Sequence, residues 1–168
     1  MTSGSDDYLI RPARSADVAA TLRLRNDAIR HSTAIWTDIQ QTPEEGAAWW
    51  DELVGRQAAY VVELDGAVIG YACWAPWRPK EGYRFTVEDS VYVAAEHQGH
   101  GLGRRLMAAL IDAARRAGMH VMLADIESGN TASITLHERL GFETVGKLRE
   151  VGIKFDRWLD LTIMRLAL

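Results

Sequence analysis

The segment best suited to chemistry is Gln98-Gly-His-Gly-Leu-Gly-Arg104, which follows a strand-like run and precedes a helix-like run. Its glycines would let the backbone turn so that several N–H groups face one point, and the N-terminus of the next helix adds partial positive charge. This arrangement suits an anionic phosphate group, although a tight structural turn is the alternative. The spacing GxGxG differs from the GxGxxG of dinucleotide-binding loops, and the Gly-Lys-Ser/Thr ending of a Walker loop is absent, so neither class is favoured.

Metal and thiol chemistry are not indicated by the sequence. His97 and His100 are three residues apart in the glycine segment but lack the further ligands of a metal site, so we expect no metal. Cys73 is the only cysteine, which rules out a disulfide within the chain. Cysteine usage and the start MTSGSDDYLI, which does not resemble a signal peptide, favour a cytoplasmic protein.

The elements that must position the glycine segment can be predicted from periodicity and from turn signals. Thr42-Pro-Glu-Glu45 is typical of a capping box with proline at the first helical position, Asp65-Gly66 indicates a two-residue type I′ hairpin, and Gly118 is expected to end a helix. The expected strands are 8–12, 60–64, 67–74, 85–94, 120–126, 143–151 and 158–166, and the expected helices are 16–30, 43–54, 102–117 and 130–140. This order predicts an α+β domain with a mixed sheet.

Composition is that of a single globular domain. The chain has 168 residues, 48% of them hydrophobic and 25% charged, so it can bury one core, and we expect a flexible tail at 1–7 followed by one domain at 8–168. Lys and Arg number 19 against 23 Asp and Glu, a net charge of −4, and no basic block stands out, so nucleic acid is not an expected partner. No apolar run is long enough to cross a membrane, so none is expected as a partner.

The pattern Gln98-x-x-Gly101-x-Gly103 after a Val-x-Val strand resembles the acyl-coenzyme A loop of the GCN5-related N-acetyltransferases (GNAT). Ile10-Arg-Pro12 and Asn130-x-x-Ser133-x-x-x-His137-x-x-x-Gly141-Phe142 extend the resemblance over almost the whole chain. Longer strings at 33–36, 83–93, 126–130 and 152–161 resemble the phosphinothricin and methionine sulfoximine acetyltransferase branch. The resemblance implies a GNAT-like α+β fold, with a mixed, mostly antiparallel twisted sheet flanked by helices. It also implies an acetyl-CoA-dependent N-acetyltransferase that acts on the α-amine of phosphinothricin, methionine sulfoximine or methionine sulfone.

The same resemblance implies how acetyl-CoA would be held as co-substrate. The backbone from 91 to 93 would hydrogen-bond the pantetheine arm, the segment 99–104 would hold the pyrophosphate, and the helix after residue 130 would touch the cofactor. The cofactor-binding residues expected on this basis are Val91, Tyr92, Val93, Gln98, Gly99, His100, Gly101, Leu102, Gly103, Arg104, Asn130 and Ser133.

Acetyl transfer needs a base, because a substrate ammonium must lose its proton before its nitrogen attacks the thioester. Glu88 is the position that the resembled branch uses as general base, and a solvated strand carboxylate is its alternative interpretation. Strand alternation places the neighbouring Asp89 on the opposite face, which makes Asp89 the weaker candidate. His137 is either the acid that protonates the departing thiolate or a packed helix histidine.

Substrate choice is expected to reside in two loops, 77–84 and 33–36. Arg78 or Arg84 could clamp a carboxylate with two parallel hydrogen bonds, Trp36 and Tyr83 could enclose the apolar part, and the resemblance brings Lys154 to the site, across a dimer interface. The full expected set is Trp36, Arg78, Gly82, Tyr83, Arg84, Thr86 and Lys154.

Two further expectations concern the partner and the alternatives. Aromatic residues in the loops 77–84 and 152–158, together with the resemblance, predict a homodimer. The alternatives to the leading function are a protein N-terminal or other small-amine acetyltransferase of the same fold, or a non-catalytic acyl-CoA-binding sensor. A polyamine substrate is disfavoured by the cations expected at the site.

Overall fold

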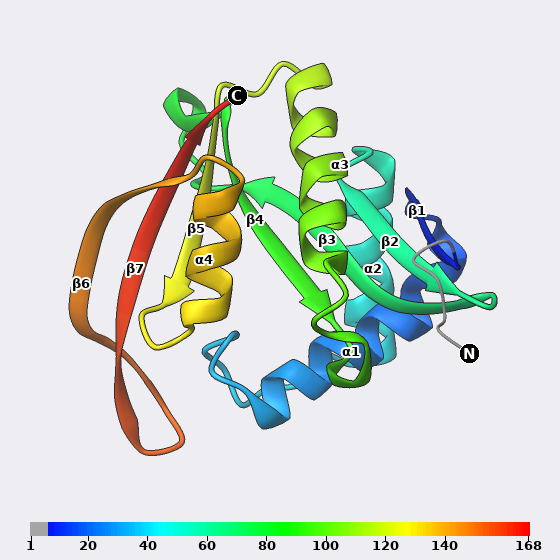
Figure 1. The fold of residues 1–168 in the computed structure, drawn as a ribbon, viewed down its shortest axis with the longest axis horizontal. Helices are drawn as coiled ribbons and strands as arrows, with labels where there is room; N and C mark the ends of the chain where they lie inside the picture. Colours follow the sequence, from blue (N-terminus) through cyan, green and yellow to red (C-terminus); the bar gives the residue numbers. More distant parts are fainter. Residues whose placement is uncertain (1–6) are drawn as a thin grey trace.

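The computed structural model describes residues 7–168, so the expected flexible tail lies outside the described residues except for Asp7. One seven-stranded sheet with the order β1-β2-β3-β4-β5-β7-β6 organises these residues, and every neighbouring pair is antiparallel except β4 and β5 (Figure 1). This is the mixed, mostly antiparallel α+β architecture that the sequence predicts. The strands are β1 (Tyr8–Pro12), β2 (Ala59–Leu64), β3 (Ala67–Pro76), β4 (Thr86–Val93), β5 (Val121–Glu127), β6 (Glu143–Lys154) and β7 (Arg157–Ala167).

Within the described residues, four α-helices cover the two faces of the sheet. Helices α1 (Val18–His31) and α2 (Pro43–Gly55) pack on one face, and α3 (Leu102–Arg116) and α4 (Thr131–Arg139) lie on the other (Figure 1). Helix α2 buries Trp50 against Tyr71 of β3, with ring centroids 5.7 Å apart, while α3 buries an apolar stripe that includes Leu106 and Leu110. None of the helices in residues 7–168 is long and apolar enough to span a membrane.

Local sequence signals account for most element boundaries. Thr42 and Glu45 form the predicted capping box, with Oγ1 of Thr42 accepting from the Glu45 N–H at 3.2 Å and Glu45 accepting from the Thr42 N–H at 2.9 Å. Asp65 and Gly66 both have positive φ angles, of 49° and 80°, as the predicted type I′ hairpin requires. Gly118 follows α3 with φ +77°.

The last hairpin differs from its prediction. The segment 152–157, expected to be a loop, belongs mostly to strands: β6 runs to Lys154 and β7 starts at Arg157. Only Phe155 and Asp156 form the turn, both with positive φ. The turn at Phe155 and Asp156 contains no glycine, so the sequence did not mark it as a two-residue turn, and the predicted strands ended short of it.

The feature that matters most for function is the separation of β4 from β5. Their parallel pairing covers only Thr86 to Glu88 on β4, against Val121 to Leu123 on β5. Beyond Glu88 the two strands diverge, as the green and yellow arrows in Figure 1 show. The edge of β4 that faces β5 therefore has no ladder partner beyond Glu88, and an opening forms in the middle of the sheet.

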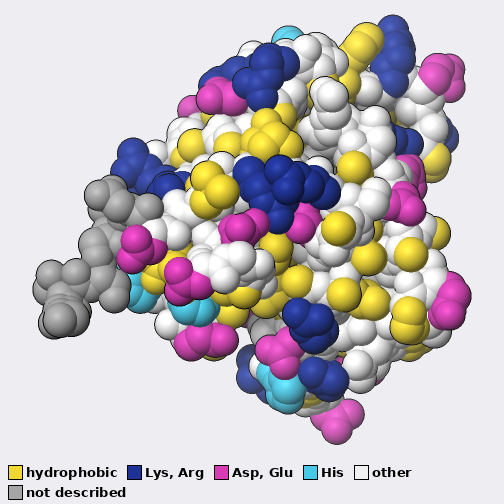
Figure 2. Space-filling model, turned by 90° about the vertical axis from the view of Figure 1, so that its right-hand side faces the viewer, with side chains coloured by type: hydrophobic (Ala, Val, Ile, Leu, Met, Phe, Trp, Pro, Cys, Tyr) yellow, Lys and Arg dark blue, Asp and Glu magenta, His cyan; other side chains and the backbone are white. Residues whose placement is uncertain are grey.

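Surface charge is mixed at the end of the molecule that carries β1. Figure 2 shows basic and acidic side chains close together there, without a broad area of one sign. Arg11 of β1 contributes two ion pairs to this region, to Asp17 and to Glu63, each at 2.8 Å.

Candidate active site

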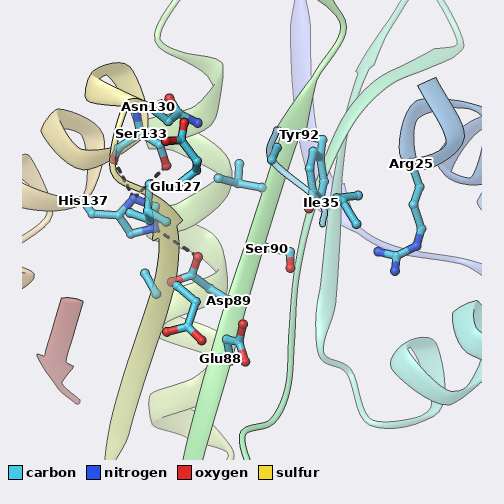
Figure 3. Close-up of a pocket in the computed structure, with 15 residues that line it drawn as sticks. Arg25, Ile35, Glu88, Asp89, Ser90, Tyr92, Glu127, Asn130, Ser133 and His137 are labelled. Carbon is cyan, nitrogen blue, oxygen red and sulfur yellow. Dashed lines mark hydrogen bonds and ion pairs between the residues drawn. The ribbon is translucent and has the colours of Figure 1, made fainter. Parts of the chain in front are cut away.

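A cavity of about 250 Å³, here called the inner cavity, occupies the opening between β4 and β5. Its lining comes from α1 and the segment after it, from β4, from β5 and from α4, so it reaches from one helical layer toward the other. Glu88, Ser90 and Tyr92 contribute one face of β4, and Asp89 and Val91 contribute the other (Figure 3).

A second depression of about 740 Å³, here called the outer groove, lies between the glycine segment and α4. It shares Val91, Asn130 and Ser133 with the inner cavity. The two spaces therefore adjoin at the unpaired edge of β4, where a molecule lying in the groove could present one end to the cavity.

The glycine segment is built to receive an anion. Gly101 is the N-cap of α3 with φ +73°, and Gly99 has φ +81°, conformations that other residues rarely adopt. No atom lies within 4 Å of the place where a Cβ would stand at either glycine, so the space above the turn is open. Open backbone at the N-terminus of a 15-residue helix is a suitable site for a phosphate.

Most of the residues expected to bind the cofactor are brought together around the outer groove. Val91, Val93 and the loop from 98 to 104, except His100, line it, together with Asn130 and Ser133 of the opposite wall. His100 turns away: its Nδ1 lies 3.1 Å from the Gln98 carbonyl oxygen and its ring is 5.8 Å from the ring of Tyr8. Tyr92 lines the inner cavity instead.

Glu88 stands at the point where the strands part, and its environment favours proton transfer near neutral pH. Burial, followed by the negative charges of Asp125 and Asp89, raises the pKa of Glu88 to about 7. A carboxyl group with this pKa is half ionised near neutral pH and can act as a general base.

Asp89 and His137 form a buried pair that sequence reasoning missed. Nε2 of His137 lies 3.0 Å from Oδ1 of Asp89, and its Nδ1 lies 2.8 Å from the Ser133 carbonyl oxygen (Figure 3). Because a carbonyl only accepts, Nδ1 carries a proton, and a second proton is shared between Nε2 and Oδ1. Burial alone would lower the pKa of His137, but the hydrogen bond and the charge of Asp89 raise it. Burial raises the pKa of Asp89, and the hydrogen bond from His137 opposes that rise.

This pair bears on two expectations, and it favours the packed-histidine interpretation of His137 over the acid role. Both ring nitrogens of His137 are already engaged and the side chain is 1% exposed, so neither nitrogen is free to protonate a departing thiolate. Asp89, the weaker candidate for the general base, joins β4 to α4, and its Oδ2 is buried without a hydrogen-bond partner. The alternation of the strand separates Glu88 from Asp89 correctly, but it cannot reveal that the opening in the sheet makes both faces accessible.

The expected substrate residues are divided by the structure. Arg78 is exposed and stacks on Trp77, with Cζ 4.3 Å from the ring centroid. Burial and the charge of Asp89 raise the pKa of Asp125, which lines the inner cavity, and the charge of Arg78 opposes that rise. Arg84 stacks on Phe85, away from the cavity lining. Gly82, Tyr83 and Thr86 lie in and after the same loop, also outside the lining.

Lys154 requires a further correction. Its Nζ donates to the carbonyl oxygens of Ile29, Ser32 and Ile35 at 2.7, 2.6 and 2.6 Å, and the residue is 3% exposed. All three protons are used inside its own chain, so this ammonium does not reach a substrate in a neighbouring subunit. It fixes instead the loop after α1, whose Ile35 lines the inner cavity.

Trp36 packs against the β6–β7 hairpin, which also carries Lys154, and it does not line the inner cavity. Its indole N–H donates to the Thr33 carbonyl at 2.9 Å, and its ring packs on the backbone of Gly152, where any Cβ would overlap it. Arg25 of α1 also lines the inner cavity, and the expected site residues did not include it. The sequence feature that could have indicated Arg25 is its position on α1, four residues from Thr21 and four from Ile29, both of which are buried.

Metal chemistry has no candidate in this region. Within residues 7–168, no group of three or more His, Cys, Asp or Glu side chains is arranged to hold a metal ion.

Comparison with known proteins gives consistent results. The acetyltransferase (GNAT) family matches residues 22–142. A curated L-methionine sulfoximine/L-methionine sulfone acetyltransferase from Salmonella typhimurium is 50% identical over 161 residues, covering 95% of this chain and 94% of that protein. A phosphinothricin N-acetyltransferase from Streptomyces viridochromogenes is 39% identical over 155 residues, covering 90% and 83%. A solved acetyltransferase structure from Salmonella typhimurium with its cofactor acetyl-CoA superposes with a TM-score of 0.93 at 47% identity, covering 96% and 94%.

Proposed function

This chain belongs to the acetyltransferase (GNAT) family, and we propose that it uses acetyl-CoA to acetylate the α-amine of a small amino-acid analogue. The observation that carries the proposal is the junction of the outer groove with the inner cavity at Val91, Asn130 and Ser133. A thioester entering from the groove would meet there an amine held beside Glu88. The names of the relatives point to methionine sulfoximine, methionine sulfone and phosphinothricin as the substrates to test.

The outer groove fits acetyl-CoA in both chemistry and shape. The open turn at Gly99 and Gly101 would receive the pyrophosphate on backbone N–H groups at the start of α3. The unpaired edge of β4 beyond Glu88 would accept the amides of the pantetheine arm in place of a neighbouring strand. Asn130 and Ser133 of the facing wall would contact the arm from α4.

Glu88 would act as the general base. The substrate ammonium gives one proton to the Glu88 carboxylate, and its nitrogen then attacks the thioester carbon. The C–S bond breaks as the tetrahedral intermediate collapses, the nitrogen loses its second proton to water, and the departing thiolate takes up a proton from that water, which leaves free coenzyme A and the neutral amide. A backbone N–H near Val93 would stabilise the oxyanion. Asp89 and His137 would position this machinery by holding α4 against β4.

Arg78 is the best candidate for the α-carboxylate of the substrate. Its charge acts on Asp125 of the cavity lining, and a guanidinium binds a carboxylate through two parallel hydrogen bonds. Ile35 and the aromatic residues of the loop from 77 to 83 would enclose the apolar part of the substrate.

The molecule would act as a homodimer in the cytoplasm, where acetyl-CoA is available. The support for a dimer is β6, an edge strand whose Val145, Leu148, Val151 and Ile153 are all exposed, continued by Phe155 and Trp158 at the hairpin. A row of exposed apolar side chains on a sheet edge is a typical association surface.

A thiol-release assay with a panel of amines tests the substrate class. Methionine sulfone, methionine sulfoximine and phosphinothricin are expected to give higher kcat/KM values than spermidine or a peptide with a free N-terminus. A higher value for the peptide or the polyamine would assign the other substrate class. Binding of acetyl-CoA without thiol release from any amine would instead indicate a non-catalytic sensor.

A further inference from the structure

Arg25 has a charge that the described structure does not neutralise. It is the only Lys or Arg side chain lining the inner cavity in the described part of the chain. Its Nε is buried without a hydrogen-bond partner, and none of the ion pairs within residues 7–168 includes it. This guanidinium lines a partly enclosed space and has no carboxylate partner there, so an anion in the cavity is the group that would pair with it.

The packing of α1 keeps this guanidinium in place. Thr21 and Ile29, one turn away on either side, are buried, so Arg25 lies on the face of α1 that packs on the sheet. Its Cζ lies 5.0 Å from the ring centroid of Trp49, at cation–π distance. The side chain is therefore held by the fold before any ligand binds, which lowers the entropy lost on binding.

The charge of Arg25 acts at one particular level of β4. Burial raises the pKa values of Tyr71, Cys73 and Tyr92, and the positive charge of Arg25 opposes each of these rises, while it is not among the influences on Glu88. Tyr71 pairs with Tyr92 and Cys73 pairs with Ser90 in the sheet. The guanidinium thus lies near the stretch from Ser90 to Tyr92, across the cavity from His137 (Figure 3).

The spacing of residues along β4 gives the distances between the groups that a substrate could contact. Glu88, Ser90 and Tyr92 alternate on one face of β4, so at roughly 3.3 Å per residue Ser90 lies about 7 Å beyond Glu88 and Tyr92 about 13 Å beyond it. The α-carboxylate of an amino acid is attached to the same carbon as its amine. That carboxylate is assigned above to Arg78, whose charge acts on Asp125, and this leaves Arg25 for the far end of the substrate's side chain.

We propose that Arg25, together with the hydroxyl groups of Ser90 and Tyr92, forms a subsite for an anionic group at the end of the substrate's side chain. This inference rests on the proposed function and deepens it. Partial burial raises the pKa of Tyr92 to about 12, so it keeps its proton and can donate it in a hydrogen bond. The enzyme would therefore prefer a side chain ending in a phosphinate or carboxylate to one ending in a neutral sulfone.

Phosphinothricin and methionine sulfone are a matched pair for the test, because their side chains have the same length and shape and differ mainly in the charge of the terminal group. Arg25→Met should lower kcat/KM for phosphinothricin by about 10- to 100-fold, the range expected for losing a charge-assisted hydrogen bond. The same variant should change kcat/KM for methionine sulfone by less than about 3-fold. Arg25→Lys, which retains the positive charge, should keep a measurable part of the preference for the anion.

Arg78→Met is the control, since it removes a cation proposed to bind the α-carboxylate that both substrates share, and it should lower both kcat/KM values equally. The subsite is refuted if Arg25→Met leaves kcat/KM unchanged for both substrates, or if each of the two Arg25 variants lowers kcat/KM by the same factor for phosphinothricin and for methionine sulfone. It is also refuted if the wild type acetylates methionine sulfone but not phosphinothricin, an outcome that leaves the proposed function intact. A wild type that acetylates neither compound contradicts the proposed function itself, and the subsite with it.

Discussion

Nε2 of His137 lies 3.0 Å from Oδ1 of Asp89, and this contact joins α4 to β4 beside the part of the sheet that has no β4–β5 ladder. Asn130 and Ser133, which line both the outer groove and the inner cavity, belong to the start of α4. The pair thus connects the wall of the groove to the strand that carries Glu88. Its removal should affect the width of the opening as well as the stability of the fold.

Asp89→Ala should lower the free energy of unfolding by about 1.5–3 kcal/mol, because it leaves the buried Nε2 of His137 without its charged partner. Urea-induced unfolding measures this change. Asp89→Asn should restore most of the loss, since an amide can donate to a neutral imidazole. An unfolding free energy unchanged in Asp89→Ala would show that the contact contributes nothing to the fold.

The free energy of unfolding should depend differently on pH in the wild type and in Asp89→Asn. The pKa of His137 is raised in the fold from its ordinary value of 6.5, so its contribution is complete below pH 6.5 and is lost as the pH rises through the folded pKa. In Asp89→Asn the buried imidazole is neutral, so the charged form of His137 adds nothing to the stability of that variant at low pH. The stability advantage of the wild type over Asp89→Asn should therefore grow as the pH falls from about 8 to about 5. An advantage that stays constant over this range would contradict the shared proton.

Glu88→Gln should lower kcat by about 10²- to 10⁴-fold at neutral pH while leaving the Kd of acetyl-CoA almost unchanged. The wild-type kcat should rise with pH and level off above about pH 7, where Glu88 is ionised. Above that pH the defect of the variant should shrink, because solution then supplies more neutral amine.

Asp125→Asn is the control for Glu88. It removes a negative charge that raises the pKa of Glu88, so the rise in kcat should move to lower pH while the plateau value stays the same. A wild-type rate for Glu88→Gln at neutral pH would remove Glu88 from the mechanism. An equal loss at every pH would indicate that its charge positions the substrate ammonium instead.

Gly101→Val should weaken acetyl-CoA binding in a calorimetric titration. The residue has φ +73° at the N-cap of α3, so a β-branched side chain strains the turn and occupies the open space proposed for the pyrophosphate. Gly118→Val is a matched control, because Gly118 has φ +77° and equally open surroundings but follows the other end of α3. Both variants should lose similar stability, and only Gly101→Val should lose affinity. Equal affinities would remove the phosphate site.

Local signals in the sequence were sufficient for the elements, and contacts between distant residues were not. The capping box at Thr42 and the hairpin at Asp65 each depend on residues within four positions of one another, so composition and spacing predict them. The contact of Asp89 with His137 spans 48 residues, and that of Lys154 with Ile29 spans 125. Whether a polar residue on a strand faces solvent or a cavity depends on where two strands separate, and alternation does not contain that information.

The exposed side of β6 predicts the oligomeric state. Sedimentation at micromolar concentration should give about twice 18.7 kDa for the wild type. Val151→Glu should reduce this to the monomer mass, because a charge would be buried in the proposed interface. Leu9→Glu is the control, since Leu9 is similarly exposed but lies on β1 at the opposite edge of the sheet. A monomeric wild type, or monomers from both variants, would contradict an interface at β6.

Lys154→Met should raise the KM for the amino-acid substrate without changing the Kd of acetyl-CoA. The variant leaves the carbonyl oxygens of Ile29, Ser32 and Ile35 without their common donor, and the loop from 32 to 36 would lose its fixed position beside the inner cavity. Each unpaired carbonyl would cost about 1–3 kcal/mol unless the loop opens to water, so opening is the expected response. Amide hydrogen exchange in residues 32–36 should accelerate accordingly.

Lys147→Met provides the comparison for Lys154, because Lys147 is exposed and its only described ion pair, with Asp160, is 3.9 Å long. It should leave KM and hydrogen exchange unchanged. A raised KM in Lys154→Met with normal exchange in residues 32–36 would mean that the ammonium touches the substrate itself. Three short hydrogen bonds to backbone carbonyls predict the other result: the lysine orders the loop, and the loop in turn shapes the cavity in which the amine is acetylated.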